Sequence, residues 1–145
     1  MSAENVELIR SIQPGPEADL VALFADAGAA RQVDVLASLL DPGFECAMHL
    51  FPGAPPTAYS GLDGLRACGR DWLAPWASYR TEIDKLIDAG ESVVAIVRDY
   101  GRREQSGAEV EMRAAAAYTV QGGRIARAEF YANRAEALAS VGLAE

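Results

Sequence analysis

The pattern of apolar and polar positions is clearest in the second half of the chain, where it predicts four β-strands. Residues 93–102 begin with five apolar residues, four of them β-branched, and continue with Arg98, Asp99 and Tyr100. Such a short apolar run is typical of a strand that is buried in a sheet. The other three stretches are residues 79–87, 110–120 and 124–132. Short turns separate all four, so we expect an antiparallel meander.

The first half of the chain, and its last residues, have the spacing of helices instead. Proline and glycine punctuate these segments, and Ser2 and Asn133 are suitable N-caps. The helices expected from this pattern cover residues 2–13, 16–26, 33–40, 62–76 and 134–141. The helix over 62–76 has an apolar stripe, which Pro75 should weaken near its end. The stripe consists of Leu62, Leu65, Gly69, Trp72 and Trp76.

Residues 44–51 alternate loosely and predict one further, short strand. One face of this strand carries Phe44, Cys46, Met48 and Leu50, and the other carries Glu45, Ala47, His49 and Phe51. The element order is then helices, a short strand, a helix and a meander. It predicts an α+β fold in which helices pack on one face of a curved antiparallel sheet. With 145 residues and no internal linker, we expect a single domain over residues 1–145.

Composition and charge narrow the class of partner. Half of the residues are hydrophobic, and the formal net charge is −8, so a nucleic acid or an anionic membrane is a poor partner. We see no secretory signal and no apolar run of the roughly 20 residues that a membrane helix needs. Cys46 and Cys68 match no metal spacing and read as small buried residues in a reducing cytoplasm. With one histidine, no metal or other cofactor is expected.

Several short motifs, in their order and spacing, resemble the SnoaL-like branch of the nuclear transport factor two-like superfamily. The motifs are Glu4-Asn5-Val6-Glu7-Leu8, Tyr59-Ser60-Gly61, Asp88-Ala89-Gly90, Ser106-Gly107, and Asn133-Arg134-Ala135-Glu136-Ala137-Leu138 with Gly142-Leu143. The resemblance implies a cone, in which a bent sheet wraps around helices and leaves an internal pocket. It also implies a homodimer through the outer face of the sheet. The superfamily includes polyketide cyclases, ketosteroid isomerases and limonene epoxide hydrolases, so the fold alone does not give the function.

Strand parity decides which residues line the pocket. If Gly122-Gly123 forms a two-residue turn, Val120 pairs with Ile125 and Thr119 with Ala126. The face that suits a cavity wall then carries Ala115, Ala117, Thr119, Ala126, Ala128 and Phe130. The face that suits a dimer interface or solvent carries Ala116, Tyr118, Val120, Ile125, Arg127, Glu129 and Tyr131.

The same question applies to residues 93–102, where either Val97 and Asp99 or Arg98 and Tyr100 face inward. By resemblance to the epoxide hydrolases, Val97 stands at their arginine, Asp99 at their aspartate and Phe130 at their second aspartate. Two of the three catalytic groups are therefore missing, which disfavours epoxide hydrolysis. Asp99 remains as the one carboxylate that we expect inside the pocket.

A carboxylate in an apolar pocket has a raised pKa and can remove a proton next to a carbonyl group near neutral pH. We therefore predict Asp99 as the catalytic base, assisted by His49 if that face of its strand points inward. The residues expected to bind the substrate are Tyr59, Trp72, Trp76, Val97, Thr119 and Phe130. In the alternative, Trp72 and Trp76 are core packing, His49 is a solvated strand residue, and Asp99 pairs with an arginine at the rim.

Three functions remain open at this point. The first is a cofactor-free isomerase or cyclase that acts on a small hydrophobic, polycyclic or aromatic carbonyl compound. The second is a non-catalytic module that binds a small apolar ligand. The third is a structural dimer without a ligand, held by Tyr118, Val120, Ile125 and Tyr131.

Overall fold

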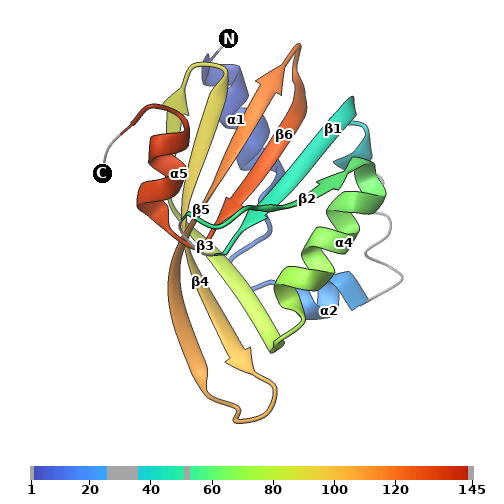
Figure 1. The fold of residues 1–145 in the computed structure, drawn as a ribbon, viewed down its shortest axis with the longest axis vertical. Helices are drawn as coiled ribbons and strands as arrows, with labels where there is room; N and C mark the ends of the chain where they lie inside the picture. Colours follow the sequence, from blue (N-terminus) through green and yellow to red (C-terminus); the bar gives the residue numbers. More distant parts are fainter. Residues whose placement is uncertain (1, 26–35, 51–52, 144–145) are drawn as a thin grey trace.

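The computed structural model describes residues 2–25, 36–50 and 53–143, and Figure 1 shows how their elements are arranged. The helices are α1 (Ser2–Ile12), α2 (Leu20–Ala25), α4 (Gly61–Leu73) and α5 (Arg134–Ser140). The strands are β1 (Leu40–His49), β2 (Thr57–Ser60), β3 (Trp76–Ala89), β4 (Ser92–Arg103), β5 (Glu109–Gln121) and β6 (Arg124–Tyr131). The α+β class predicted from the sequence is confirmed.

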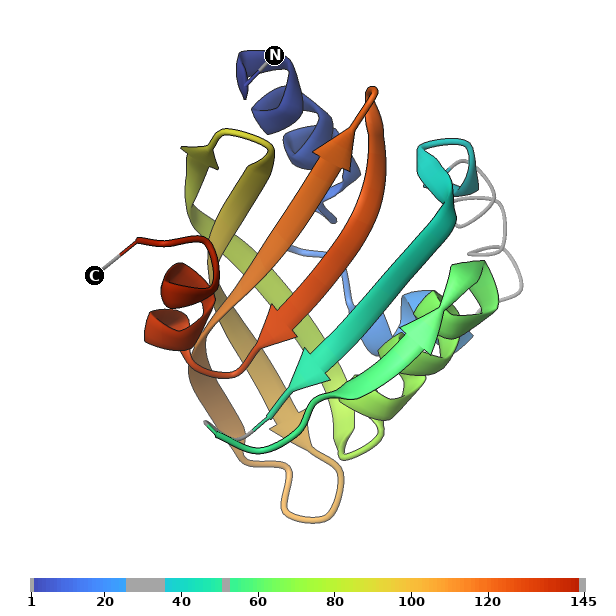
Figure 2. The same ribbon diagram turned by 45° about the horizontal axis from the view of Figure 1, so that its top comes forward.

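All six strands form one sheet in the order β2-β1-β6-β5-β4-β3. The pairs β3–β4, β4–β5, β5–β6 and β1–β2 are antiparallel, and only β1 runs parallel to its neighbour β6. Figure 2 shows β1 between β6 and the short edge strand β2. The predicted meander therefore occupies one half of the sheet, and the early part of the chain adds the other edge.

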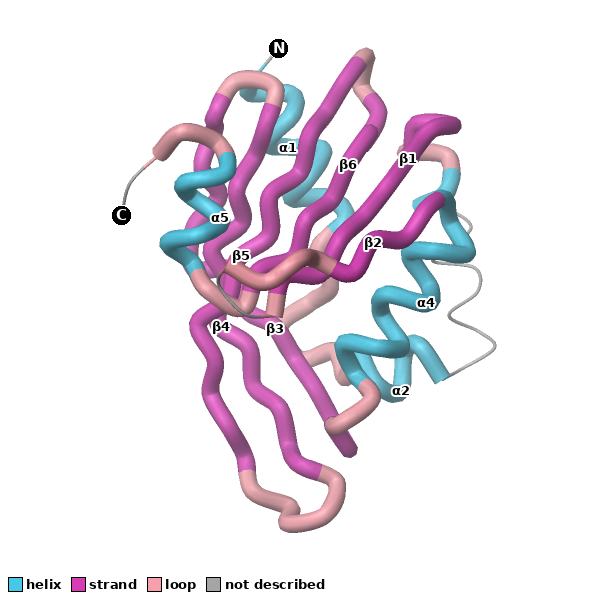
Figure 3. The backbone as a smooth tube through the Cα atoms, in the orientation of Figure 1, coloured by secondary structure: helices cyan, strands magenta, loops and turns pink. Residues whose placement is uncertain are grey.

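Helices lie on both sides of the sheet, but unequally (Figures 1 and 3). We call the side covered by α1, α2 and α4 the inner face and the side covered by α5 the outer face. The main apolar core fills the inner face, and α5 buries a smaller cluster on the outer face. On β4 the two sets alternate as a strand requires, with Val93, Ala95 and Val97 inside and Val94 and Ile96 outside.

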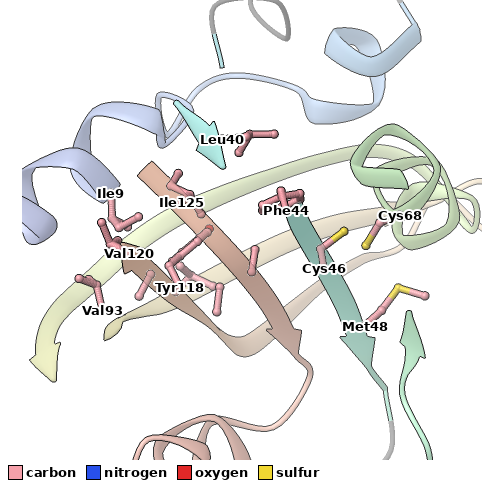
Figure 4. Packing of buried hydrophobic residues seen from close by; sticks show 14 of the residues in the cluster. Ile9, Leu40, Phe44, Cys46, Met48, Cys68, Val93, Tyr118, Val120 and Ile125 are labelled. Carbon is pink, nitrogen blue, oxygen red and sulfur yellow. The ribbon is translucent and has the colours of Figure 1, made fainter. Parts of the chain in front are cut away.

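The inner core joins residues from β1, α4 and the meander (Figure 4). Phe44, Cys46 and Met48 point inward from β1, which is the more apolar face that the alternation of residues 44–51 defines. The partner face, with His49, therefore points outward.

A β-bulge changes the parity that the hairpin turn predicts. Val120 pairs with Ile125 as expected, but Thr119 pairs with Arg127, so Ala126 is an extra residue in β6. The bulge reverses the facing of β5 relative to the rest of β6. On the inner face lie Ala114, Ala116, Tyr118, Val120, Ile125, Ala128 and Phe130.

Of the residues predicted to share the cavity-wall face, Ala128 and Phe130 lie on the inner face. Ala115, Ala117 and Thr119 belong to the outer face instead. The same bulge corrects the facing of three of the four predicted dimer residues, and Tyr131 keeps its predicted side. Tyr118, Val120 and Ile125 are buried in the inner core, and Tyr131 is buried in the outer cluster. As core residues they cannot form an interface with a second copy.

Element boundaries differ from the prediction in three places. Helix α4 ends at Leu73, because Pro75 has no amide hydrogen to continue it, and Trp76 begins β3. Leu40, expected at the end of a helix, begins β1 and pairs with Ile125. Strand β2 was not expected at all. The start of the helix predicted over 33–40 and the end of the strand predicted over 44–51 lie outside the described residues.

No helix among the described residues combines the length and the hydropathy that crossing a bilayer requires.

Candidate functional site

Asp99 lies on the inner face of β4, in line with Val93, Ala95 and Val97. It is 5 % exposed and is the one buried charged residue in the part of the chain that the structure describes. Burying a carboxylate costs free energy unless its oxygens are hydrogen-bonded. The parity of residues 93–102 is therefore settled with Val97 and Asp99 inside, as the site hypothesis requires.

Two hydroxyl groups satisfy the carboxylate. Thr81 Oγ1 donates to Asp99 Oδ1 at 2.6 Å, and the Tyr79 hydroxyl donates to Asp99 Oδ2. Trp72 Nε1 in turn donates to the Tyr79 hydroxyl oxygen at 2.8 Å. The result is a continuous hydrogen-bond chain from α4 through β3 to β4, in which Asp99 is the terminal acceptor.

The register of β3 and β4 produces this arrangement. Thr81 pairs with Asp99, and Tyr79 pairs with Gly101, so residues of one parity on both strands share the inner face. The N-terminal end of α2 also fixes the position of Tyr79, through the residue that precedes the helix. Asp19 Oδ1 accepts hydrogen bonds from Tyr79 N at 3.0 Å and from Val21 N at 3.1 Å. Asp19 therefore caps the start of α2 and ties that helix to the strand that carries Tyr79.

Burial raises the pKa of Asp99 above its ordinary value, because desolvation disfavours the ionised carboxylate. The hydrogen bonds from Thr81 and Tyr79, and then the positive charge of Arg134, oppose this rise without cancelling it. Burial also raises the pKa of Tyr79, and the negative charge of Asp99 adds to this effect. Asp99 is thus a stronger base than an exposed aspartate, and Tyr79 remains a neutral hydrogen-bond donor.

Arg134 acts from the opposite side of the sheet. Its Nη2 atom donates to the carbonyl oxygen of Val97 at 2.7 Å and to Asp84 Oδ2 at 2.9 Å. The guanidinium group therefore holds the start of α5 against the strand that carries Asp99. It contributes a positive charge behind the site without contacting the carboxylate.

Aromatic and apolar side chains close the end of the inner face next to Asp99. The Trp76 ring lies directly on Gly101, where an added Cβ would come within 2.4 Å of Trp76 Cε3. The Trp76 and Tyr79 rings are 5.7 Å apart, and Leu73 and Met112 complete this cluster. Asp99 therefore faces an apolar surrounding that excludes water, which is the physical cause of its raised pKa.

His49 does not lie near Asp99, and the prediction that it assists the base is wrong in this structure. Its ring stacks on Tyr131 of the outer cluster, with the ring centroids 4.2 Å apart. His49 Nε2 lies 3.2 Å from Glu129 Oε1, and Nδ1 lies 3.8 Å from Glu136 Oε1. The sheet itself separates His49 from the carboxylate, because alternate residues of a strand face opposite sides.

The residues predicted to bind a substrate fall into two groups. Tyr59, Trp72, Val97 and Phe130 contribute to the inner core, and Trp76 belongs to the cluster beside Asp99. Thr119, in contrast, pairs with Ser92 and Arg127 on the outer face. The tryptophans pack in the core, as their spacing also suggested, and Asp99 is not paired with an arginine at the rim. Arg98 pairs with Asp84 and Glu111, and Arg102 pairs with Glu109.

Three residues of the site were missed by the sequence analysis, namely Tyr79, Thr81 and Asp19. The first two could have been found from the hairpin between residues 79–87 and 93–102. Once the turn at Asp88-Ala89-Gly90 fixes the register, every second residue of the earlier strand faces the same side as Asp99. Asp19 has no such signal, since its contact with Tyr79 depends on where α2 packs.

A cleft of about 210 Å³ opens beside the site, where β3 begins, β4 ends and β5 begins. It is lined by Glu17, Asp19, Ser78, Tyr79, Arg80, Tyr100, Arg102 and Glu109. Most of these side chains are charged, and Arg80 stacks on the Tyr100 ring at 4.0 Å. The cleft shares Tyr79 and Asp19 with the Asp99 site, but Asp99 is not among its lining residues. Within the described ranges, no group of three or more histidine, cysteine or acidic side chains could hold a metal ion.

Comparison with known proteins agrees with this architecture. Residues 21–128 match the family model of the SnoaL-like domain. A search of curated proteins found no match.

Three solved structures with similar folds share little sequence with this chain. A candidate SnoaL-like polyketide cyclase from Jannaschia sp. CCS1 has a TM-score of 0.68 and 18% identity, over 90% of this chain and 85% of that one. An NTF2-like protein of unknown function from Burkholderia pseudomallei K96243 has a TM-score of 0.61 and 17% identity, over 96% and 98%. TerC, co-crystallised with polyporic acid, has a TM-score of 0.59 and 16% identity, over 88% and 89%.

These likenesses show the fold, and the family model covers most of the chain. The resemblance drawn from the short motifs is therefore confirmed. The chain belongs to the SnoaL-like domain family and has the NTF2-like fold.

Proposed function

We propose that this protein binds a small, largely apolar carbonyl compound on its inner face and isomerises or cyclises it with Asp99 as the base. The observation that carries the proposal is the burial of Asp99 among aromatic and apolar side chains, with hydroxyl groups rather than cations as its hydrogen-bond partners. A buried carboxylate with a raised pKa is costly to keep, and such groups are concentrated at functional sites.

The proposed chemistry needs only a proton transfer. Asp99 removes a proton from the carbon next to the carbonyl group, and the electron pair of that bond forms an enolate. In an isomerisation, Asp99 returns the proton to another carbon of the conjugated enolate. In a cyclisation, the enolate carbon bonds to the carbon of a second carbonyl group, whose oxygen becomes an alkoxide and takes the proton back from Asp99. Tyr79 and Thr81 hold the carboxylate in place, and Trp72 fixes the orientation of the Tyr79 hydroxyl.

The family and its structural neighbours support this class of reaction. The neighbours include the candidate polyketide cyclase from Jannaschia sp. CCS1 and TerC, which was co-crystallised with polyporic acid. Five of the six residues that the sequence predicts to bind the substrate share the inner side of the sheet with Asp99, namely Tyr59, Trp72, Trp76, Val97 and Phe130. Flat aromatic side chains of this kind favour planar or polycyclic ligands.

The test is to screen aromatic and polycyclic carbonyl compounds by native mass spectrometry and to assay the hits with wild type and Asp99→Asn. The proposal expects the variant to bind the hit and to lose turnover by about 100-fold or more. Thr81→Ser keeps the hydroxyl group and is the matched control, which should retain turnover within about three-fold of wild type. Full turnover in Asp99→Asn would remove Asp99 as the base.

A non-catalytic binding module is the second candidate, and a specific observation favours it. Each Asp99 oxygen already accepts a hydroxyl hydrogen bond, so the carboxylate is satisfied without a substrate. This candidate expects hits that bind equally well to wild type and Asp99→Asn and that leave both proteins chemically unchanged.

We also propose a homodimer through the part of the outer face that α5 leaves uncovered. This area carries Arg98, Glu111 and Arg127, which are partly or largely exposed. Arg98 pairs with Glu111 across β4 and β5, and Arg127 pairs with Glu129 of its own strand β6. Sedimentation at micromolar concentration should show a dimer. If charged side chains of this area meet those of the second copy, the dimer should dissociate as salt is raised, because salt screens exposed charges. A monomer at low salt would contradict the proposal.

A further inference from the structure

The inner core contains two nucleophilic side chains that the proposed reaction does not use. Cys46 on β1 and Cys68 on α4 are both free, and each is 2 % exposed. Figure 4 shows their sulfur atoms pointing toward one another across the contact between the strand and the helix. Apolar side chains of the inner core surround the pair, and Asp71 and the Tyr59 hydroxyl are the polar groups next to it.

The two thiols are chemically different. Their mutual interaction lowers the pKa of Cys46 and raises the pKa of Cys68, where burial adds to the rise. The thiolate is the form of cysteine that reacts with oxidants and disulfides. Cys46 is therefore suited to react first. Cys68 lies next to it and can attack the oxidised Cys46 sulfur, which is the role of a resolving thiol.

We propose that Cys46 and Cys68 form a reversible intramolecular disulfide that links β1 to α4 when a hydroperoxide reaches the protein. The Cys46 thiolate attacks the peroxide, breaks its O–O bond and becomes a sulfenic acid. The Cys68 sulfur then attacks the Cys46 sulfur and displaces water. In total the two thiols lose two protons and two electrons, and one molecule of hydrogen peroxide becomes two molecules of water.

Access to the pair requires a local opening at one edge of the sheet. Cys46 pairs with Tyr59 of β2, which has only four residues and is the edge strand of the sheet. The Tyr59 hydroxyl donates to Asp71 Oδ2 at 2.5 Å, which closes β2 against α4. Short edge elements open more readily than the central strands of a sheet. Opening there admits the oxidant, and closing brings the two sulfur atoms back together.

The first experiment treats the reduced protein with hydrogen peroxide, denatures it, blocks the remaining thiols with N-ethylmaleimide and measures the intact mass. The expected result is the loss of two hydrogen atoms, no blocked thiol and a cross-linked peptide that contains both cysteines. Dithiothreitol should restore both thiols. Intact thiols, a sulfinic acid without a cross-link, or a disulfide only between copies would overturn the proposal.

Cys46→Ala and Cys68→Ala test the order of the two steps. Cys68→Ala should accumulate a sulfenic acid at Cys46. In Cys46→Ala, Cys68 should react with peroxide at least about ten-fold more slowly than Cys46 does in Cys68→Ala. Equal reactivity of the two single variants would contradict the assigned order.

A measurement on the wild type alone covers the case in which the variants fail to fold. The disulfide is equilibrated with reduced and oxidised glutathione, once in native buffer and once in concentrated urea. If the fold places the sulfurs for bonding, the native protein should favour the disulfide by about ten-fold or more over the unfolded chain. If the native protein favoured the disulfide no more than the unfolded chain does, the proposal would be overturned.

Discussion

The two faces of the sheet hold two titratable sites that differ in the partners they offer. On the inner face, Asp99 is almost fully buried and its partners are the neutral hydroxyl groups of Thr81 and Tyr79. On the outer face, His49 lies near the carboxylates of Glu129 and Glu136. Both groups sit on strands of one sheet, Asp99 on β4 and His49 on β1. They differ in the face of the sheet they occupy, in their partners and in their degree of burial.

This difference teaches why one group suits chemistry and the other suits structure. A buried carboxylate without an opposite charge beside it is poorly stabilised in its ionised form. A small change at the site therefore shifts the balance between its ionised and protonated forms. The contacts of His49 with two glutamates are partly exposed, and solvent screens interactions of this kind. We therefore expect the inner site to respond strongly to substitution and the outer site weakly.

The largest expected effect is on turnover of a substrate found by the ligand screen. Asp99→Asn should lower kcat by about 100-fold or more, because the amide cannot accept a proton near neutral pH. His49→Gln should leave kcat within about two-fold, since the sheet separates this side chain from Asp99. A large loss in His49→Gln would break the distinction between the two faces.

Packing beside the inner site should be the next most sensitive feature. In Gly101→Ala the new methyl group would meet the Trp76 ring, and we expect unfolding free energy to fall by about 1–3 kcal/mol. Gly15→Ala is the matched control, because nothing lies within 4 Å of its added Cβ. Urea denaturation measures both variants. Equal stability of the two variants would show that Trp76 moves aside freely.

The hydrogen-bond chain can be tested at its middle residue. Tyr79→Phe removes the donor to Asp99 and leaves Trp72 Nε1 without its acceptor. We expect the pKa of Asp99 to rise further, because that hydrogen bond favours the ionised form, and stability at pH 7 to fall by about 1–3 kcal/mol. Carbonyl-region NMR of a sample labelled at the aspartate carboxyl carbons follows the titration. A lower pKa of Asp99 in the variant would contradict this account of the site.

The pH dependence of stability has a definite sign. Burial raises the pKa of Asp99 in the folded state above its value in the unfolded chain. Asp99 therefore contributes stability that is fully present below its pKa in the unfolded chain and is lost as pH rises through its pKa in the folded state. Asp99→Asn avoids this loss, so its unfolding free energy relative to wild type should increase between about pH 4 and pH 8.

Each unit by which the pKa of Asp99 is raised corresponds to about 1.4 kcal/mol of that difference. Urea denaturation of both proteins across the pH range measures it. A difference that stays constant, or that falls toward pH 8, would contradict a raised pKa.

The smallest effect is expected at the outer site. His49→Gln should reduce stability by less than about 1 kcal/mol, because its contacts with the two glutamates are partly exposed and its main packing is one ring stack. The loss should be insensitive to salt if the stack with Tyr131 dominates and should shrink with salt if the ion pairs dominate. Thermal denaturation at low and high ionic strength separates these cases. A loss of several kcal/mol would show that the two sites are equally critical.

Much of this arrangement followed from the sequence. The apolar run of residues 93–97 and the strict alternation of a strand connected Asp99 to the buried positions Val93, Ala95 and Val97. The same reasoning applies to residues 44–51, where the face with Phe44, Cys46 and Met48 is the more apolar one. Giving that face to the core would have placed His49 outside without any structure.

Local pattern also predicted the four strands of the meander, most of the helices, the hairpin turn at Gly122-Gly123 and the family, because turn chemistry and hydrophobic period are properties of neighbouring residues. Three features depended on contacts between distant segments. The bulge at Ala126 reversed the parity of β5, the packing of α2 brought Asp19 to Tyr79, and the approach of α4 placed Trp72 on Tyr79 and Cys68 opposite Cys46. A bulge is retained because one register buries more apolar surface than the alternative, and helix placement is the sum of many weak packing contacts. The sequence therefore determined which residues could carry the chemistry, and the tertiary structure decided which of them meet.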